Sequence, residues 1–153
     1  MEWTQSHVVY NMISLVWKGV QLERRYGHLL FGALVAELLA AAHLITVALA
    51  ALLAANIPGY RYLYRDQCAV GFSAVLFGLK VVLNHDSPGF SQVMGVTLPT
   101  KYLCWAELVL ASYLNPSASF LGHLAGILAG LLHVRCVEPA LRGLAAGMLP
   151  RSG

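Results

Sequence analysis

Residues 29–55, LLFGALVAELLAAAHLITVALAALLAA, decide the fold class of this chain. From Leu38 to Tyr60 the sequence contains no Lys, Arg, Asp or Glu, and the apolar run ends at Asn56-Ile57-Pro58-Gly59, a typical turn sequence. About 20 predominantly apolar residues are enough for a helix to cross a bilayer. The stretch therefore predicts a membrane-spanning helix.

The composition extends this interpretation to the rest of the chain. Its 153 residues are 58% hydrophobic and 11% charged, whereas a soluble domain carries about 25% charged residues. A net charge of +3 is too small to indicate a nucleic-acid-binding surface, and three cysteines exclude a fully paired disulfide scaffold. We expect an all-α polytopic membrane helix bundle with no metal and no cofactor.

The apolar segments predict about five transmembrane helices in one membrane domain, residues 1–136, followed by a short cytosolic tail, residues 137–153, without a folded unit of its own. The helices are expected at about 5–25, 29–55, 68–84, 101–114 and 117–136. With the C-terminus inside, eight of the ten Lys and Arg residues lie on the inner side. Because basic residues favour the cytoplasmic side, we expect the N-terminus to be outside or lumenal.

Four polar residues are expected at similar depth in three helices that run in the same direction. His7 and Asn11 lie in the first helix, Ser73 in the third and His123 in the fifth. Each lies within about eight residues of its helix start, no more than about 12 Å below the outer surface. Polar groups at this depth are costly and usually mark function or a water-filled cavity.

We expect the charged residues inside the helices to have structural rather than catalytic roles. Glu37 and Glu107 are expected to be hydrogen-bond partners between helices rather than catalytic groups. Lys80 lies near the end of the third helix, where its side chain is expected to extend to the membrane surface.

Small residues recur on the two helices that carry Ser73 and His123. Gly122, Gly126 and Gly130 repeat every four residues, and Gly71, Ala74 and Gly78 flank the serine. Such faces allow close helix packing in lipid, which would bring the serine hydroxyl and the histidine ring within hydrogen-bond distance. The alternative is that the glycines serve packing only and that the serine bonds its own helix backbone.

These motifs resemble those of the rhomboid intramembrane proteases over about residues 5–135. Gly71-Phe72-Ser73-Ala74 resembles their Gly-x-Ser-Gly motif, and Gly122-His123-Leu124-Ala125-Gly126 with Gly130 resembles their histidine-helix motif. His7-Val8-Val9-Tyr10-Asn11 resembles the His-x-x-x-Asn of their second transmembrane helix. The resemblance implies an intramembrane serine endopeptidase with a Ser–His dyad that cleaves transmembrane segments.

The resemblance also implies a role for each matched residue. Ser73 would be the nucleophile and His123 the general base and acid, with an oxyanion hole formed by His7, Asn11 and the Ser73 backbone N–H. The supporting or packing positions are Gly71, Ala74, Phe77, Gly122, Gly126 and Gly130. Ala74 replaces the usual second glycine, and Phe77 stands where many members carry Tyr, so that packing against the histidine ring remains without a hydroxyl bond.

Three functional hypotheses follow from the residues and the resemblance. The first is the protease, and the second is a rhomboid-like pseudoprotease that binds membrane clients for degradation. The third is a small transporter or pore, but the sequence shows neither an inverted repeat nor a Gly/Pro-broken helix pair, which would favour it. The family core has six helices and the matched part begins at the second, so we expect a truncated form with low activity.

The expected partners and location follow from the same resemblance. The partners are single-span membrane protein substrates and the lipid bilayer, without nucleic acid. Ubiquitin or segregase contacts are expected only from tail motifs that one rhomboid subfamily carries further downstream and that these residues lack. The expected location is the endoplasmic reticulum membrane.

Overall fold

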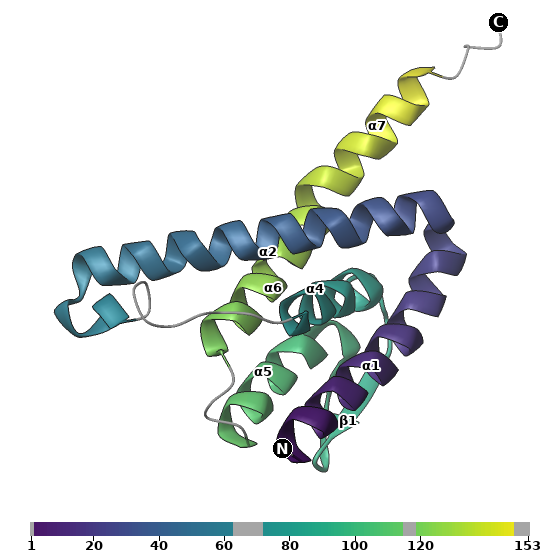
Figure 1. The fold of residues 1–153 in the computed structure, drawn as a ribbon. Helices are drawn as coiled ribbons and strands as arrows, with labels where there is room; N and C mark the ends of the chain where they lie inside the picture. Colours follow the sequence, from purple (N-terminus) through teal and green to yellow (C-terminus); the bar gives the residue numbers. More distant parts are fainter. Residues whose placement is uncertain (1, 63–71, 115–118, 149–153) are drawn as a thin grey trace, which may run out of the picture.

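A short, buried helix, α4 (Ser73–Asn84), lies at the centre of the fold. The structure is a computed structural model that describes residues 2–62, 72–114 and 119–148. Around α4 pack α1 (Glu2–Tyr26), α2 (His28–Asn56), α5 (Leu103–Leu114) and α6 (Phe120–Leu132), as Figure 1 shows. Nine of the twelve α4 residues, 74–82, are buried. The expected all-α bundle is confirmed.

A glycine forms the corner between α1 and α2. Gly27 has φ +80°, a left-handed conformation that favours glycine, and its N–H donates to the Glu23 carbonyl at 2.8 Å. Its own carbonyl accepts from the Phe31 N–H, so α2 begins directly at the corner. The boundaries of α1 and α2 thus lie close to the expected 5–25 and 29–55.

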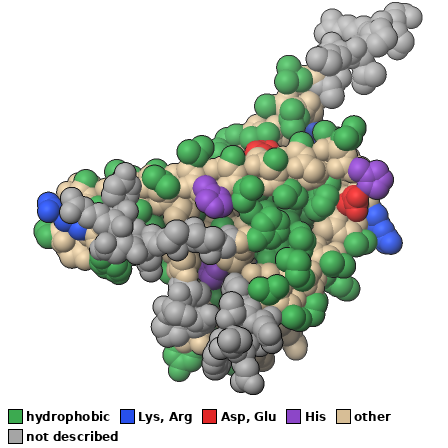
Figure 2. All heavy atoms as spheres, viewed as in Figure 1, with side chains coloured by type: hydrophobic (Ala, Val, Ile, Leu, Met, Phe, Trp, Pro, Cys, Tyr) green, Lys and Arg blue, Asp and Glu red, His purple; other side chains and the backbone are tan. Residues whose placement is uncertain are grey.

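Two helical stretches of the described residues are long and apolar enough to cross a membrane. They are α2 and the continuous stretch Phe120–Leu144, while α4 is apolar but shorter. At 1.5 Å per residue the 29 residues of α2 extend about 43 Å, more than the hydrocarbon core of a bilayer. Charged side chains on the face in Figure 2 gather mainly at the two ends of α2, with hydrophobic side chains between them.

The chain remains helical beyond the expected fifth span. A π-helical segment, His133–Val137, joins α6 to α7 (Glu138–Met148), which extends away from the bundle in Figure 1. Pro139 lacks the N–H that an α-helix needs, and the wider turn precedes it: the Glu138 N–H donates to the His133 carbonyl five residues back. Most of the expected tail, residues 137–153, is therefore helical.

The loop after α4 contains a β-hairpin. Strands β1 (Phe90–Val93) and β2 (Val96–Pro99) pair in antiparallel fashion, and Met94-Gly95 forms the two-residue turn. Both turn residues have positive φ, 49° and 83°, as a type I′ turn requires. A 3₁₀ turn, η2 (Thr100–Tyr102), then leads into α5, which begins at Leu103 rather than at the expected 101.

Two carboxylates join helices inside the bundle. The Glu37 carboxylate on α2 lies 2.9 Å and 3.1 Å from His133 Nδ1, and the Glu107 carboxylate on α5 pairs with Lys80 Nζ on α4. Both glutamates are thus the expected partners between helices. Lys80 is 7% exposed, and its side chain turns to Glu107 rather than to the surface of the bundle.

Candidate active site

Ser73 and His123 come together between α4 and α6. Ser73 is the first residue of α4 and His123 lies in the first turns of α6. The His123 Nε2 and Ser73 Oγ atoms are 3.1 Å apart, a hydrogen-bond distance. The expected contact is therefore confirmed, whereas the catalytic roles stay a prediction.

Close backbone packing between α4 and α6, beginning next to this pair, explains the contact. A methyl group added at Gly126 would lie 2.9 Å from the Ala74 Cα and closer still to its carbonyl group. A methyl group at Gly130 would lie 2.7 Å from the Gly78 carbonyl oxygen. The two small-residue faces thus hold α4 and α6 together, and Ala74 in place of glycine fits this packing.

Ser119 is the N-cap that fixes the start of α6, and this capping role was not expected from the sequence. Its side-chain oxygen accepts from the Gly122 N–H at 3.1 Å, and its carbonyl accepts from the His123 N–H at 3.1 Å. Gly122 therefore packs on this N-cap rather than on α4. The available signal was a serine just before an apolar run, a common N-cap pattern. The expected start of this helix at 117 lies outside the described residues.

The Phe77 ring packs against the His123 ring. Their centroids are 4.6 Å apart with an interplanar angle of 31°. Phe77 lies one turn after Ser73 on the same helix, so one face of α4 presents the hydroxyl and the ring that restricts the imidazole. His123 itself is 6% exposed, and its orientation is thus restricted by surrounding groups. The expected packing between these rings is confirmed.

The two side chains expected in the oxyanion hole, those of His7 and Asn11, belong to α1, which packs against α4. Asn11 is 9% exposed. His7 belongs to α1, but its side chain lies outside the described residues, and so does the whole of Gly71. Ser73 opens α4, where backbone N–H groups lack acceptors within the helix. A carbonyl oxygen bound beside Ser73 would meet a helix N-terminus, which favours negative charge.

Comparisons with known proteins give a consistent result. Residues 4–139 match the family model described as Rhomboid domain. The chain is 46% identical over 131 residues to "Rhomboid-like protein 14, mitochondrial" of Arabidopsis thaliana, covering 86% of this chain and 39% of the relative.

Animal relatives show a similar likeness. "Rhomboid-related protein 4" of Mus musculus is 42% identical over 132 residues, and that of Homo sapiens 41% over 132. Each alignment covers 84% of this chain and 41% of the relative. The chain thus spans about two fifths of the length of these relatives. No solved structure matches.

Proposed function

The chain belongs to the rhomboid family of integral membrane proteins, and on that premise we propose that it is an intramembrane serine endopeptidase. Its substrates are single-span membrane proteins, cleaved within or beside their transmembrane segments. The observation that carries the proposal is the 3.1 Å separation between His123 Nε2 and Ser73 Oγ. A serine hydroxyl is a weak nucleophile unless an adjacent base takes its proton.

In the first half of the reaction, Ser73 Oγ attacks the carbonyl carbon of the scissile peptide bond. His123 Nε2 accepts the hydroxyl proton and then donates it to the leaving amine, leaving an acyl-enzyme ester on Ser73. In the second half, water attacks the ester, its proton passes to His123 Nε2 and then to Ser73 Oγ, and the carboxylic acid product leaves. Phe77 restricts the imidazole through ring packing.

A fluorophosphonate probe tests the proposal, because it labels serines activated by a base. The chain in membranes should be labelled, and Ser73→Ala should abolish the label. Ser112→Ala is the matched control, since the Ser112 hydroxyl donates to its own helix at the Leu108 carbonyl, 2.7 Å away. Labelling that persists in Ser73→Ala would reject the nucleophile. A folded chain that is never labelled would favour the pseudoprotease that binds clients without cleaving them.

We propose that Asn11, with His7 and the Ser73 N–H, stabilises the oxyanion of the tetrahedral intermediates. Asn11→Ala should lower kcat about 10²–10³-fold, the usual loss for one donor, with little change in KM. Asn56→Ala is the control, because the Asn56 side chain is exposed and donates to the Leu52 carbonyl. A kcat of Asn11→Ala within twofold of the parent would remove Asn11 from the oxyanion hole.

We also propose the endoplasmic reticulum membrane, with the N-terminus lumenal. A glycosylation acceptor in a flexible insert after Gly59 should be modified, and one at the C-terminus should not. The motivation is the eight-to-two distribution of basic residues. Modification of the C-terminal acceptor would reverse the topology. The name of the Arabidopsis relative contains the word mitochondrial. If neither acceptor were modified and the protein were found in mitochondria, the location in the endoplasmic reticulum would be contradicted.

A further inference from the structure

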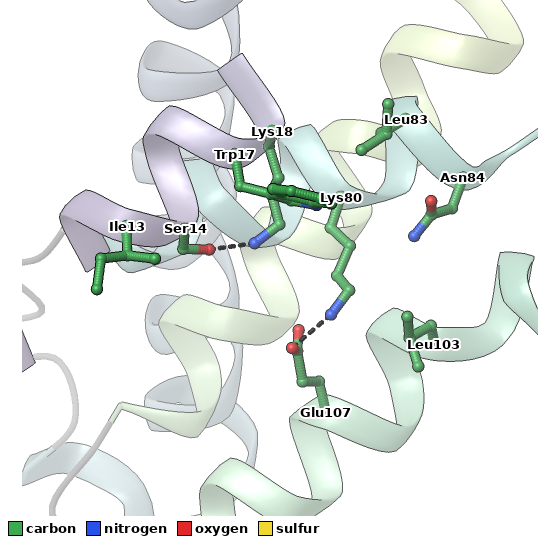
Figure 3. A pocket seen from close by; sticks show the side chains of 9 residues that line it. All are labelled: Ile13, Ser14, Trp17, Lys18, Lys80, Leu83, Asn84, Leu103 and Glu107. Carbon is green, nitrogen blue, oxygen red and sulfur yellow. Dashed lines mark hydrogen bonds and ion pairs between the residues drawn. The ribbon is translucent and has the colours of Figure 1, made fainter. Parts of the chain in front are cut away.

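Two buried lysines lie side by side away from the serine. Lys18 on α1 is 8% exposed and Lys80 on α4 is 7% exposed. Figure 3 shows their ammonium groups in one pocket: Lys18 Nζ donates to Ser14 Oγ, and Lys80 Nζ pairs with the Glu107 carboxylate. Among the described residues, Lys80 thus has a carboxylate within ion-pair distance, whereas Lys18 has none.

The pocket between α1, α4 and α5 has a volume of about 330 Å³. Such a volume lies at the lower end of the usual range for small-molecule sites, about 300–1,000 Å³. Its polar wall carries Lys18, Lys80, Glu107 and the Asn84 amide. The two ammonium groups and the amide are hydrogen-bond donors, and the one carboxylate, an acceptor, is already paired with Lys80.

The site is separate from the Ser73–His123 pair. Lys80 follows Ser73 by seven residues and Lys18 follows Asn11 by seven, which is two helical turns in each case. The pocket therefore lies about 10 Å further along both helices. If the bundle spans the bilayer as expected, the pocket faces the leaflet opposite the active site.

The charges of the pocket favour an anion. Two ammonium groups and one carboxylate leave an excess of one positive charge when all three are ionised. A charge at membrane depth is costly unless it is paired, so Lys18 favours a negatively charged ligand. Phosphate oxygens would accept from Lys18 Nζ and the Asn84 amide without breaking the Lys80–Glu107 pair. A metal cation would face two like charges.

The rim of the pocket indicates where the anion comes from. Ile13 is 65% exposed and Trp17 is 71% exposed, and Leu83 and Leu103 complete an apolar edge. Exposed apolar residues on a membrane helix contact acyl chains, and an indole ring is common at the level of lipid headgroups. Basic pockets between membrane helices are known headgroup sites. We propose that this pocket binds the phosphate group of an anionic phospholipid, with the acyl chains along Ile13 and Trp17.

The test uses the full chain in uncharged detergent, with its thermal unfolding midpoint followed by far-UV circular dichroism. Dioleoyl phosphatidate should raise the midpoint, and Lys18→Gln should weaken this binding about 10- to 100-fold, the size expected for one charge-assisted hydrogen bond. Lys18→Arg should retain binding. Lys101→Gln is the matched control, because Lys101 is an exposed lysine outside the pocket.

Equal phosphatidate dependence in Lys18→Gln and Lys101→Gln would overturn the site. Inorganic phosphate at the same concentration separates the two sources of the anion. Stabilisation by phosphatidate but not by inorganic phosphate supports the lipid, whereas equal stabilisation by both would overturn the lipid assignment. Dioleoyl phosphatidylcholine should stabilise less, because its choline group brings a positive charge to the pocket.

A second measurement tests the proposal even if Lys18→Gln fails to fold. Phosphatidate with brominated acyl chains should quench tryptophan fluorescence more than brominated phosphatidylcholine does. The excess quenching should disappear in Trp17→Phe, which leaves the other two tryptophans in place. Equal quenching by the two lipids, or an excess that survives in Trp17→Phe, would show that phosphatidate does not occupy this rim.

Discussion

Replacing Ser73 by alanine should reduce cleavage of a single-span substrate by about 10⁴–10⁶-fold in the whole protein, and His123→Ala should do the same. The double variant should be no slower than either single variant, because the two groups act as one unit and removal of either one stops the reaction. The geometry behind this expectation is the contact between Nε2 and Oγ at 3.1 Å. Cleavage rates for the four proteins, at equal expression, provide the measurement.

Another histidine serves as the control for this series. His43 lies exposed on α2, and its Nδ1 contacts the Leu39 carbonyl of its own helix at 2.7 Å. His43→Ala should therefore leave the cleavage rate unchanged. If the losses of Ser73→Ala and His123→Ala multiplied in the double variant, the two residues would act independently, and the dyad would be the wrong description.

The sequence predicted the part of the fold that depends on apolar runs and small residues. The first two helices were placed closely because the apolar run is long and the turn sequence Asn56-Ile57-Pro58-Gly59 marks its end. The contact between Ser73 and His123 was also predictable, since small residues on two neighbouring helices let their backbones approach closely. Both inferences rest on patterns that can be read from neighbouring residues in the sequence.

Features that depend on tertiary contacts were not predictable in the same way. The hairpin turn uses Met94-Gly95, which lacks the Asn-Gly or Asp-Gly signal of such turns. Lys80 lies near its helix end, and only the position of Glu107 on another helix explains why it stays inside.

The C-terminal helix was missed for a related reason. No helix was expected after residue 136, but a π-helical segment, His133–Val137, leads into α7. Glu138 also holds α7 near α1: it accepts from Tyr26 Oη at 3.2 Å and lies 3.8 Å from Arg25 Nη2. These partners are 112 and 113 residues apart in the sequence, beyond the reach of any local pattern.

The close packing of α4 and α6 at Gly126 leads us to expect a large loss of stability and of cleavage when this glycine is replaced. An alanine at Gly126 would place its methyl group against backbone atoms of Ala74, which cannot rotate away as a flexible side chain can. The two helices must therefore move apart next to the Ser73–His123 pair. Added volume in a packed interior costs typically about 1–3 kcal/mol and occasionally more, and a misplacement of about 1 Å costs about 10²-fold in rate.

Gly126→Ala should accordingly lower both the stability of the bundle and the cleavage rate, the latter by about 10²-fold or more. Unfolding in mixed detergent and SDS measures the first effect, and cleavage in membranes measures the second. Gly32→Ala is the matched control: Gly32 lies inside α2 with nothing within 4 Å of an added methyl group, and alanine there favours the helix by up to about 1 kcal/mol. Because both variants make the same chemical change inside a helix, any difference between them reports the steric contact with Ala74. Equal stability and equal cleavage in the two variants would mean that α4 and α6 do not need this close approach, and the alignment of Ser73 with His123 would then require another cause.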